Sequence, residues 1–287
     1  MTQVMNMLEK VTLGKHYFQI AMLLRESIFL NGILTNAASW YGLSSTHISQ
    51  LESVDKLLLR QIMNTPMSTP VEALFLELGI VGIGTTIKAA RVNYLHYLAT
   101  RNENEMIYKV FIAQWNRPVK NDWTVTVRQD LRDLKIEENL SFFKSKSSKS
   151  FKLFVKRKIM EFEFERLMKL KDRENRSKMN DLSYTKLEMQ NYLMLENMNK
   201  AGAQTLFKYR VRMANFGENY RGGPSPVSCP MCHTHLDNQK MAFENCQVLR
   251  QNIDVSVSNN SIFSYSVNSA VVKSLQDIIK FREEYMK

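Results

Sequence analysis

Apolar residues recur at helical spacing through most of this chain. The clearest example is segment 45–63, in which Ile48, Leu51, Val54, Leu58 and Ile62 fall three or four positions apart. That spacing places them on one face of a helix. Only 10 Gly and 6 Pro occur among 287 residues, so the composition is not that of a low-complexity or disordered chain. We therefore predict an all-α protein.

Local start and stop signals predict further helices. Residues 16–34 are the most apolar run and favour a buried helix; Arg25 and Glu26 interrupt the run, which excludes a membrane span. In segment 69–79, Thr69 is a candidate N-cap that forms a capping box with Glu72, and Gly79 ends the helix. The same criteria predict helices over 87–100, 105–115, 125–134, 144–178, 183–193, 201–213 and 274–286.

Two proline-containing breaks divide the chain. Pro118 stands in the first, and the sequence RGGPSP at 221–226 forms the second. We predict a helical region over 1–117, a basic helical region over 118–220, a small cysteine-containing segment over 221–250, and a tail over 251–287 that ends in a helix. Within the tail, residues 253–269 are rich in Ser and Asn and alternate as a strand does.

The positive charge is concentrated in one part of the chain. The formal net charge is +11, and the segment from Lys144 to Lys178 holds thirteen basic and five acidic residues, a net +8. Such a balance favours a polyanionic partner, RNA or DNA. Aromatic rings also alternate with cations at 207–212, where a ring can stack on an unpaired base. The alternative is that these cations lie on a solvated helix face and that the aromatic residues belong to the core. The candidate nucleic-acid-binding residues are Lys144, Lys146, Lys149, Lys152, Lys156, Arg157, Lys158, Lys208, Tyr209, Arg210 and Arg212.

The three cysteines are Cys229, Cys232 and Cys246. An odd number argues against a closed disulfide framework, and C-x-x-C without a secretory signal is typical of metal or redox chemistry in a reducing compartment. We therefore expect an intracellular protein, nuclear or cytoplasmic, that is neither secreted nor bound to a membrane. A redox role is disfavoured because no βαβ pattern surrounds the motif.

The cysteine spacing predicts a zinc site with one uncertain ligand. Two thiolates at C-x-x-C spacing form a tight knuckle for a tetrahedral ion, and Cys246 supplies a third ligand. The fourth must be His233, His235 or a residue outside the stretch. His233 adjoins Cys232, so His235, three residues further on, is the preferred candidate. The alternative is a degenerate knuckle with three free thiols. The remaining histidines, His16, His47 and His96, are expected to be packing or surface residues.

Several of these segments together resemble a known family. Residues 13–79 and 93–123, the phrases YTKLEMQNYL and LFKYRVRM, and CPMCHTHLDNQKMAFENC at 229–246 resemble the reverse transcriptases of non-LTR, LINE-like retrotransposons, from the thumb to the C-terminal cysteine–histidine knuckle. The likeness covers about residues 10–250. It implies that region 1–117 is a thumb-like helical bundle, which holds template and primer, and that the knuckle assists nucleic-acid binding.

The resemblance also implies what this chain lacks. The family's C-x-x-C falls on Cys229 and Cys232, and its last cysteine falls on Cys246, but Met241 and Ala242 occupy the neighbourhood of its histidine. His235 would be a substitute for that ligand. Polymerase chemistry needs paired carboxylates that hold two Mg²⁺ ions, and the sequence contains no Asp-Asp dipeptide. We therefore expect a nucleic-acid-binding fragment that is not itself an enzyme.

Two other functions compete with this hypothesis. One is a helical protein–protein interaction module, which would expose an apolar seam and form a defined oligomer. The other is a transposon remnant without function. Under the family hypothesis, a polymerase palm domain, or self-association through exposed thumb surface, is an additional expected partnership.

Overall fold

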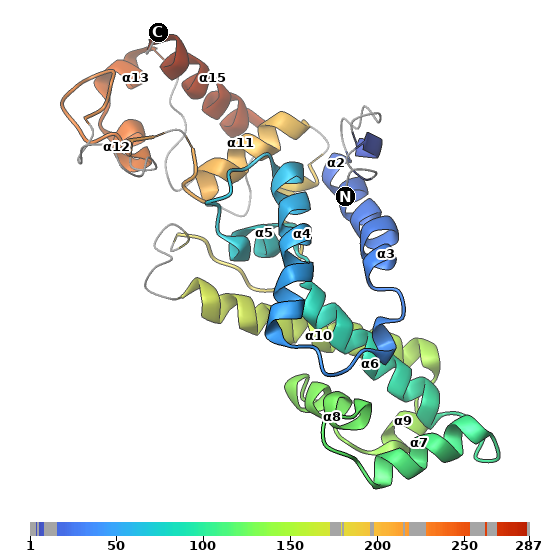
Figure 1. Ribbon diagram of the computed structural model, residues 1–287. Coiled ribbons are helices and arrows are strands. Elements are labelled where there is room, and N and C mark those ends of the chain that lie inside the picture. Colours follow the sequence, from blue (N-terminus) through green and yellow to red (C-terminus); the bar gives the residue numbers. More distant parts are fainter. Residues whose placement is uncertain are drawn as a thin grey trace. The chain divides into compact units, whose positions relative to one another are not determined.

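The computed structural model confirms the all-α class, and no β-strand occurs among the residues it describes (Figure 1). Those residues are 4, 6–8, 16–172, 179, 181–195, 198–214, 216–217, 228–252, 262 and 269–285. The main α-helices are α2 (Tyr17–Leu24), α3 (Asn31–Ile33), α4 (Ser45–Met63), α5 (Val71–Leu78), α6 (Ile83–Ala99), α7 (Met106–Asn116), α8 (Trp123–Asp133), α9 (Leu140–Lys144), α10 (Ser148–Lys171), α11 (Lys200–Arg210), α12 (Gln239–Glu244), α13 (Gln247–Asn252) and α15 (Ser269–Tyr285). A π-helix over Arg25–Leu30 joins α2 to α3, and short 3-10 turns cover Ala37–Ser39 and Asn191–Leu193.

The chain divides into two compact units, each built from separated segments. Unit 1 comprises Met1–Leu24, Leu57–Gly79 and Lys169–Lys287, and unit 2 comprises Arg25–Lys56 and Ile80–Met168. This division differs from the four consecutive regions expected from the sequence, because the chain leaves unit 1 and returns to it twice.

The core of unit 2 lies among α6, α7, α8, α9 and α10. Leu95 of α6, Trp115 of α7, Leu131 of α8, Phe143 of α9 and Phe151 of α10 are buried there together. Burying an apolar side chain of this size contributes about 1.5–3 kcal/mol. The core therefore fixes one face of α10 to the unit and leaves its other face to solvent.

A buried carboxylate adds to the junction of α10 and α6. Glu163 accepts hydrogen bonds from the Gly82 amide at 3.1 Å and from the Thr85 hydroxyl at 2.7 Å, and it pairs with Arg166. These partners satisfy a buried charge and also the free amide at the start of α6.

Unit 1 is held by a second buried charge. Glu77 of α5 accepts from Arg210 Nε at 3.1 Å and from the Tyr184 hydroxyl at 2.7 Å, and Arg210 Nη1 also donates to the carbonyl of Ile262 at 2.9 Å. Next to it, Gly79 has a φ of 64°, and a Cβ at that position would lie 2.1 Å from the Glu188 carbonyl carbon. Only glycine allows this close approach.

Pairing with the end of α5 shows that one helix prediction is wrong. Segment 183–193 is not an α-helix: Met189 forms an isolated antiparallel bridge with Leu78, and the Gln190 amide donates to the Glu77 carbonyl at 2.9 Å. An extended strand-like pairing with the end of α5 therefore overrides the helical spacing. In addition, Thr69 does not cap α5, because its buried hydroxyl has no hydrogen-bond partner among the described residues.

Other predictions fall outside the described structure or are confirmed by it. The linker at 221–226, residues 173–178 of the basic segment, and most of 253–268 are not among the described residues. The long basic helix is confirmed over Ser148–Lys171 and the closing helix over Ser269–Tyr285. No single helix in the described part is long and apolar enough to cross a membrane, whereas the broken pair Val71–Leu78 and Ile83–Ala99 passes that test of length and composition together.

Candidate metal centre and cationic surface

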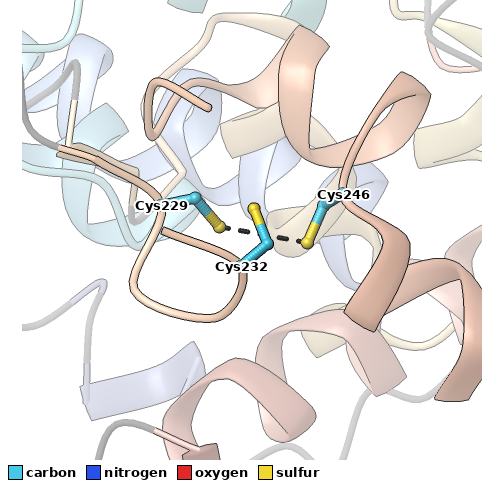
Figure 2. A group of neighbouring side chains, drawn as sticks. All are labelled: Cys229, Cys232 and Cys246. Carbon is cyan, nitrogen blue, oxygen red and sulfur yellow. Dashed lines mark hydrogen bonds between the residues drawn. The ribbon is translucent and has the colours of Figure 1, made fainter. Parts of the chain in front are cut away.

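The three cysteines lie together in unit 1. Their Sγ atoms are all within 4.8 Å of one another, and Cys229 Sγ lies 3.9 Å from Cys246 Sγ. Cys229 and Cys246 are buried, and Cys232 is partly buried. Figure 2 shows the three side chains converging from the C-x-x-C loop and from the segment that carries Cys246. The group can hold a metal ion, as the sequence predicts for these three residues.

Main-chain hydrogen bonds shape the C-x-x-C loop. The Cys229 amide donates to the His235 carbonyl at 2.7 Å, and the His233 amide donates back to the Cys229 carbonyl at 2.9 Å. An isolated bridge between Ser228 and Leu236 closes the loop. Both thiols of the loop therefore project from one tight turn, which is the local geometry that a metal knuckle needs.

Cys246 follows α12 in the chain, and its thiol lies beside those of the C-x-x-C loop. The Asn238 side chain caps α12 by accepting from the Met241 amide at 2.8 Å, and the Cys246 amide donates to the Met241 carbonyl at 3.1 Å. The segment is further anchored to α15, because buried Asp237 pairs with Arg282 at 2.8 Å and accepts from the Gly217 amide at 2.7 Å. Sequence reasoning missed this anchor, since nothing local links Asp237 to an arginine 45 positions away.

The local environment shifts the pKa values of the Cys232 and Cys246 thiols in opposite directions. Burial alone would raise the pKa of Cys232, but hydrogen bonds from the Thr234 hydroxyl and amide, the Cys229 thiol and the His235 amide outweigh it and bring that pKa to about 6. Burial raises the pKa of Cys246 to about 12, and the neighbouring cysteines add to that rise. The hydrogen bonds thus favour the thiolate form of Cys232, and burial disfavours that of Cys246.

The sulfur spacing fits a tetrahedral thiolate site. A Zn–S bond of about 2.3 Å in tetrahedral geometry places two sulfurs about 3.8 Å apart. The 3.9 Å between Cys229 and Cys246 is close to that value, and the remaining pairs need only small side-chain adjustments to reach it.

The predicted fourth ligand is not part of this group. Among the described residues, the group consists of the three cysteines and does not include His235. Its main chain has another role, because its carbonyl accepts from Cys229 and its amide donates to Cys232 Sγ. His235 therefore shapes the loop with its backbone, and the expectation that its ring completes the site stays a prediction.

One face of α10 carries a stripe of cations. Lys149, Lys152, Lys156 and Arg157 are all exposed and stand at i, i+3, i+7 and i+8, so they share one helical face. We call these four residues the cation stripe. None of them forms an ion pair with any residue that the structure describes. Leu153, 61% exposed, lies among them.

The other predicted cations of this region have partners. Lys144 pairs with Glu103 at 2.8 Å, and Lys158 pairs with Glu161 at 3.2 Å. The Lys146 ammonium lies over the rings of Phe142 and Phe154, 5.0 and 5.6 Å from their centres. These three side chains are thus partly committed to contacts within unit 2.

The second predicted cluster, at the end of α11, lies in unit 1 and is mostly buried. Tyr209 is 1% and Arg210 is 3% exposed, so neither offers a surface to a base or a phosphate. The prediction that these two bind nucleic acid is therefore corrected. Arg212 is partly exposed and pairs with Asp181, while half-buried Lys208 has its pKa lowered by burial.

Comparisons with known proteins identified no relative. Neither a scan against protein-family models nor searches of curated proteins and solved structures found a match.

Proposed function

We propose that this chain binds RNA or DNA through the cation stripe on α10. The observation that carries the proposal is that four exposed cations share one helical face and have no acidic partner among the residues that the structure describes. A cation that is paired with a carboxylate of the protein must break that pair before it can bind a phosphate. These four side chains need only release solvent and counterions.

The dimensions of the stripe suit a nucleic-acid backbone. Lys149 to Arg157 spans eight residue steps, or about 12 Å at 1.5 Å per residue. That length faces about three to four phosphates of one strand at 3.4 Å spacing. Because such contacts address the backbone, the proposal predicts weak dependence on base sequence.

The test is the salt dependence of oligonucleotide affinity. Changing Lys149, Lys152 and Lys156 together to Gln is expected to weaken binding and to lower the magnitude of the slope of log K against log[salt] by about two to three. Fluorescence anisotropy with labelled RNA and DNA measures both quantities.

The matched control removes the same charge elsewhere in unit 2. Lys109, Arg117 and Lys120 are also exposed, and their triple Gln variant is expected to retain most of the slope. Equal losses in the two variants would show that net charge, and not the stripe, attracts the nucleic acid. Absence of binding by the unmodified protein at low salt would refute the proposal.

For the cysteine group we propose a structural zinc ion held by Cys229, Cys232 and Cys246. Thiolate ligands favour zinc among the abundant divalent ions, and a structural zinc contributes directly to folding. Here it would join the C-x-x-C loop to the segment after α12, with the fourth ligand supplied by a group other than these three cysteines.

The same proposal includes the origin of the chain. We propose that it is the thumb-to-C-terminus part of a LINE-like reverse transcriptase, acting as a binding module without polymerase activity. The support is the likeness of the quoted segments, together with the thiol group at Cys229, Cys232 and Cys246, where that family has its knuckle. If this origin is correct, adding an active palm domain as a separate chain is expected to reconstitute reverse-transcriptase activity.

A second candidate function is protein–protein interaction, favoured by α7. Met106 is 74% and Val110 is 57% exposed one turn apart. Light scattering with and without an oligonucleotide separates the candidates: a defined oligomer that nucleic acid leaves unchanged favours interaction, and a monomer that binds the oligonucleotide favours the cation stripe.

A further inference from the structure

Unit 2 contains an open apolar cavity that the proposed function does not use. It has a volume of about 720 Å³ and lies between the first half of α4 and the segment 33–43. Its apolar lining includes Ile33, Trp40, Tyr41, Leu51 and Val54. The volume falls within the roughly 300–1,000 Å³ of pockets that bind small organic molecules. None of these residues belongs to the cation stripe.

The wall that carries the two aromatic residues is held in place by buried polar groups. The Arg91 guanidinium donates to the Trp40 carbonyl at 3.2 Å and is itself paired with Asp130 at 2.5 Å. The Trp123 indole donates to the Ala38 carbonyl at 2.8 Å. Side chains from α6 and α8 therefore fix the backbone of this wall, which makes that side of the cavity preorganised.

Two polar side chains of α4, His47 and Gln50, also line the cavity. The Ser44 amide donates to His47 Nδ1 at 3.4 Å, while the His47 amide lies 3.3 Å from the Ser44 hydroxyl oxygen, which accepts from it. The Ser44 hydroxyl also lies 3.1 Å from His47 Nδ1, so this reciprocal cap at the start of α4 engages Nδ1. Nε2 is therefore the ring nitrogen that the cap leaves for a ligand, and it donates a hydrogen bond in the tautomer in which Nδ1 accepts from the Ser44 amide.

The lining also restricts the charge of an occupant. Among the described residues that form it, there is no Lys, Arg, Asp or Glu. A phosphate, carboxylate or ammonium group would lose hydration there without gaining a counter-charge. The lining thus disfavours a nucleotide or an acidic peptide, and the aromatic walls favour a flat ring.

The geometry points to a binding site for an uncharged, planar aromatic molecule that carries a hydrogen-bond acceptor. The rings of Trp40 and Tyr41 supply apolar contact, Leu51 and Val54 supply the opposite surface on α4, and His47 Nε2–H binds the acceptor. The site is independent of nucleic-acid binding, because it shares no residue with the cation stripe.

The test uses Prodan, a neutral naphthalene ketone whose emission moves to shorter wavelength in apolar surroundings. Saturable binding of one Prodan per chain is expected. Val54→Asp places a carboxylate in the lining and is expected to weaken binding at least about tenfold. His47→Phe keeps a ring but removes the donor, and is expected to weaken binding roughly fivefold.

The control variant is Val110→Asp on α7. Val54 is 40% and Val110 is 57% exposed, so both variants place the same charge at a solvent-accessible helical position, and circular dichroism checks their folding. Prodan affinity is expected to be unchanged by Val110→Asp. The anionic naphthalene anilinonaphthalene sulfonate is expected to bind at least about tenfold more weakly than Prodan, although the protein carries net charge +11.

Three outcomes would overturn the assignment. They are no saturable Prodan binding by the unmodified protein, equal or tighter binding of the sulfonate, and loss of Prodan binding in Val110→Asp but not in Val54→Asp. The last would locate the dye on the exposed apolar face of α7. None of these outcomes bears on the salt-dependent binding of oligonucleotides, so failure of this inference is distinguishable from failure of the proposed function.

Discussion

Glu77→Gln is expected to destabilise unit 1 by about 3–5 kcal/mol, the usual consequence of removing one partner of a buried ion pair. Glu77 is fully buried and Arg210 is 3% exposed. The variant keeps the size of the side chain but leaves the guanidinium without a counter-charge, and it weakens the acceptor for the Tyr184 hydroxyl. Urea unfolding followed by circular dichroism measures the change.

Asp181→Asn is the matched control for that variant. Asp181 pairs with Arg212, two residues after Arg210, but both side chains of this pair are partly exposed. Solvent screens such pairs, so the expected cost is below about 1 kcal/mol. Similar costs in the two variants would contradict the structural role assigned to Arg210, and would return it to the candidates for nucleic-acid contact.

Cys229→Ser is expected to abolish stoichiometric zinc binding. The variant removes a thiolate that ligates the ion directly, and changes in the outer shell alone commonly cost 10–100-fold in affinity, so a loss of at least about 100-fold is expected. Metal content after dialysis against a weak chelator measures it. Because zinc binds the folded form, added zinc should raise the unfolding temperature of the unmodified protein but not that of the variant.

His235→Ala separates a backbone role from a ligand role. The loop uses the amide and carbonyl of His235, which the alanine retains, so one zinc per chain is expected. Loss of zinc in this variant, equal to that in Cys229→Ser, would show that the imidazole is the fourth ligand. Absence of zinc from the unmodified protein would mean that the three thiols are a decayed knuckle.

The sequence predicts the helices whose apolar spacing is long and regular. Ser45–Met63 and Ser148–Lys171 both lie where periodicity places them, because the same face that repeats in the sequence is buried in the fold. Segment 183–193 has similar spacing but is not an α-helix, since Met189 and Gln190 bond to the end of α5. That partner is more than a hundred residues away, and local spacing carries no information about it.

The same limit applies to the candidate sites. The cysteine spacing correctly predicts that Cys229, Cys232 and Cys246 converge, because C-x-x-C is a local motif. Alternating rings and cations at 207–212 predict an exposed surface, but Tyr209 and Arg210 are buried against α5 and other parts of unit 1. Charge alone does not distinguish a buried, paired arginine from an exposed one, so burial had to come from the structure.

The cavity shows a third kind of limit. His47 was expected to be a packing or surface residue, and nothing in the sequence joins it to Trp40 and Tyr41. Their shared cavity arises because Arg91 and Trp123 hold the backbone of segment 37–41. Those anchors come from helices later in the chain.

The central claim is that the cation stripe contacts nucleic acid, and lysine footprinting tests it most directly. Brief acetylation of the protein with and without saturating RNA or DNA, followed by mass spectrometry, reports the reactivity of each lysine. The account predicts that nucleic acid protects Lys149, Lys152 and Lys156, while exposed Lys109 and Lys120 react as before. Unchanged reactivity of the three stripe lysines in a demonstrably bound complex would contradict it.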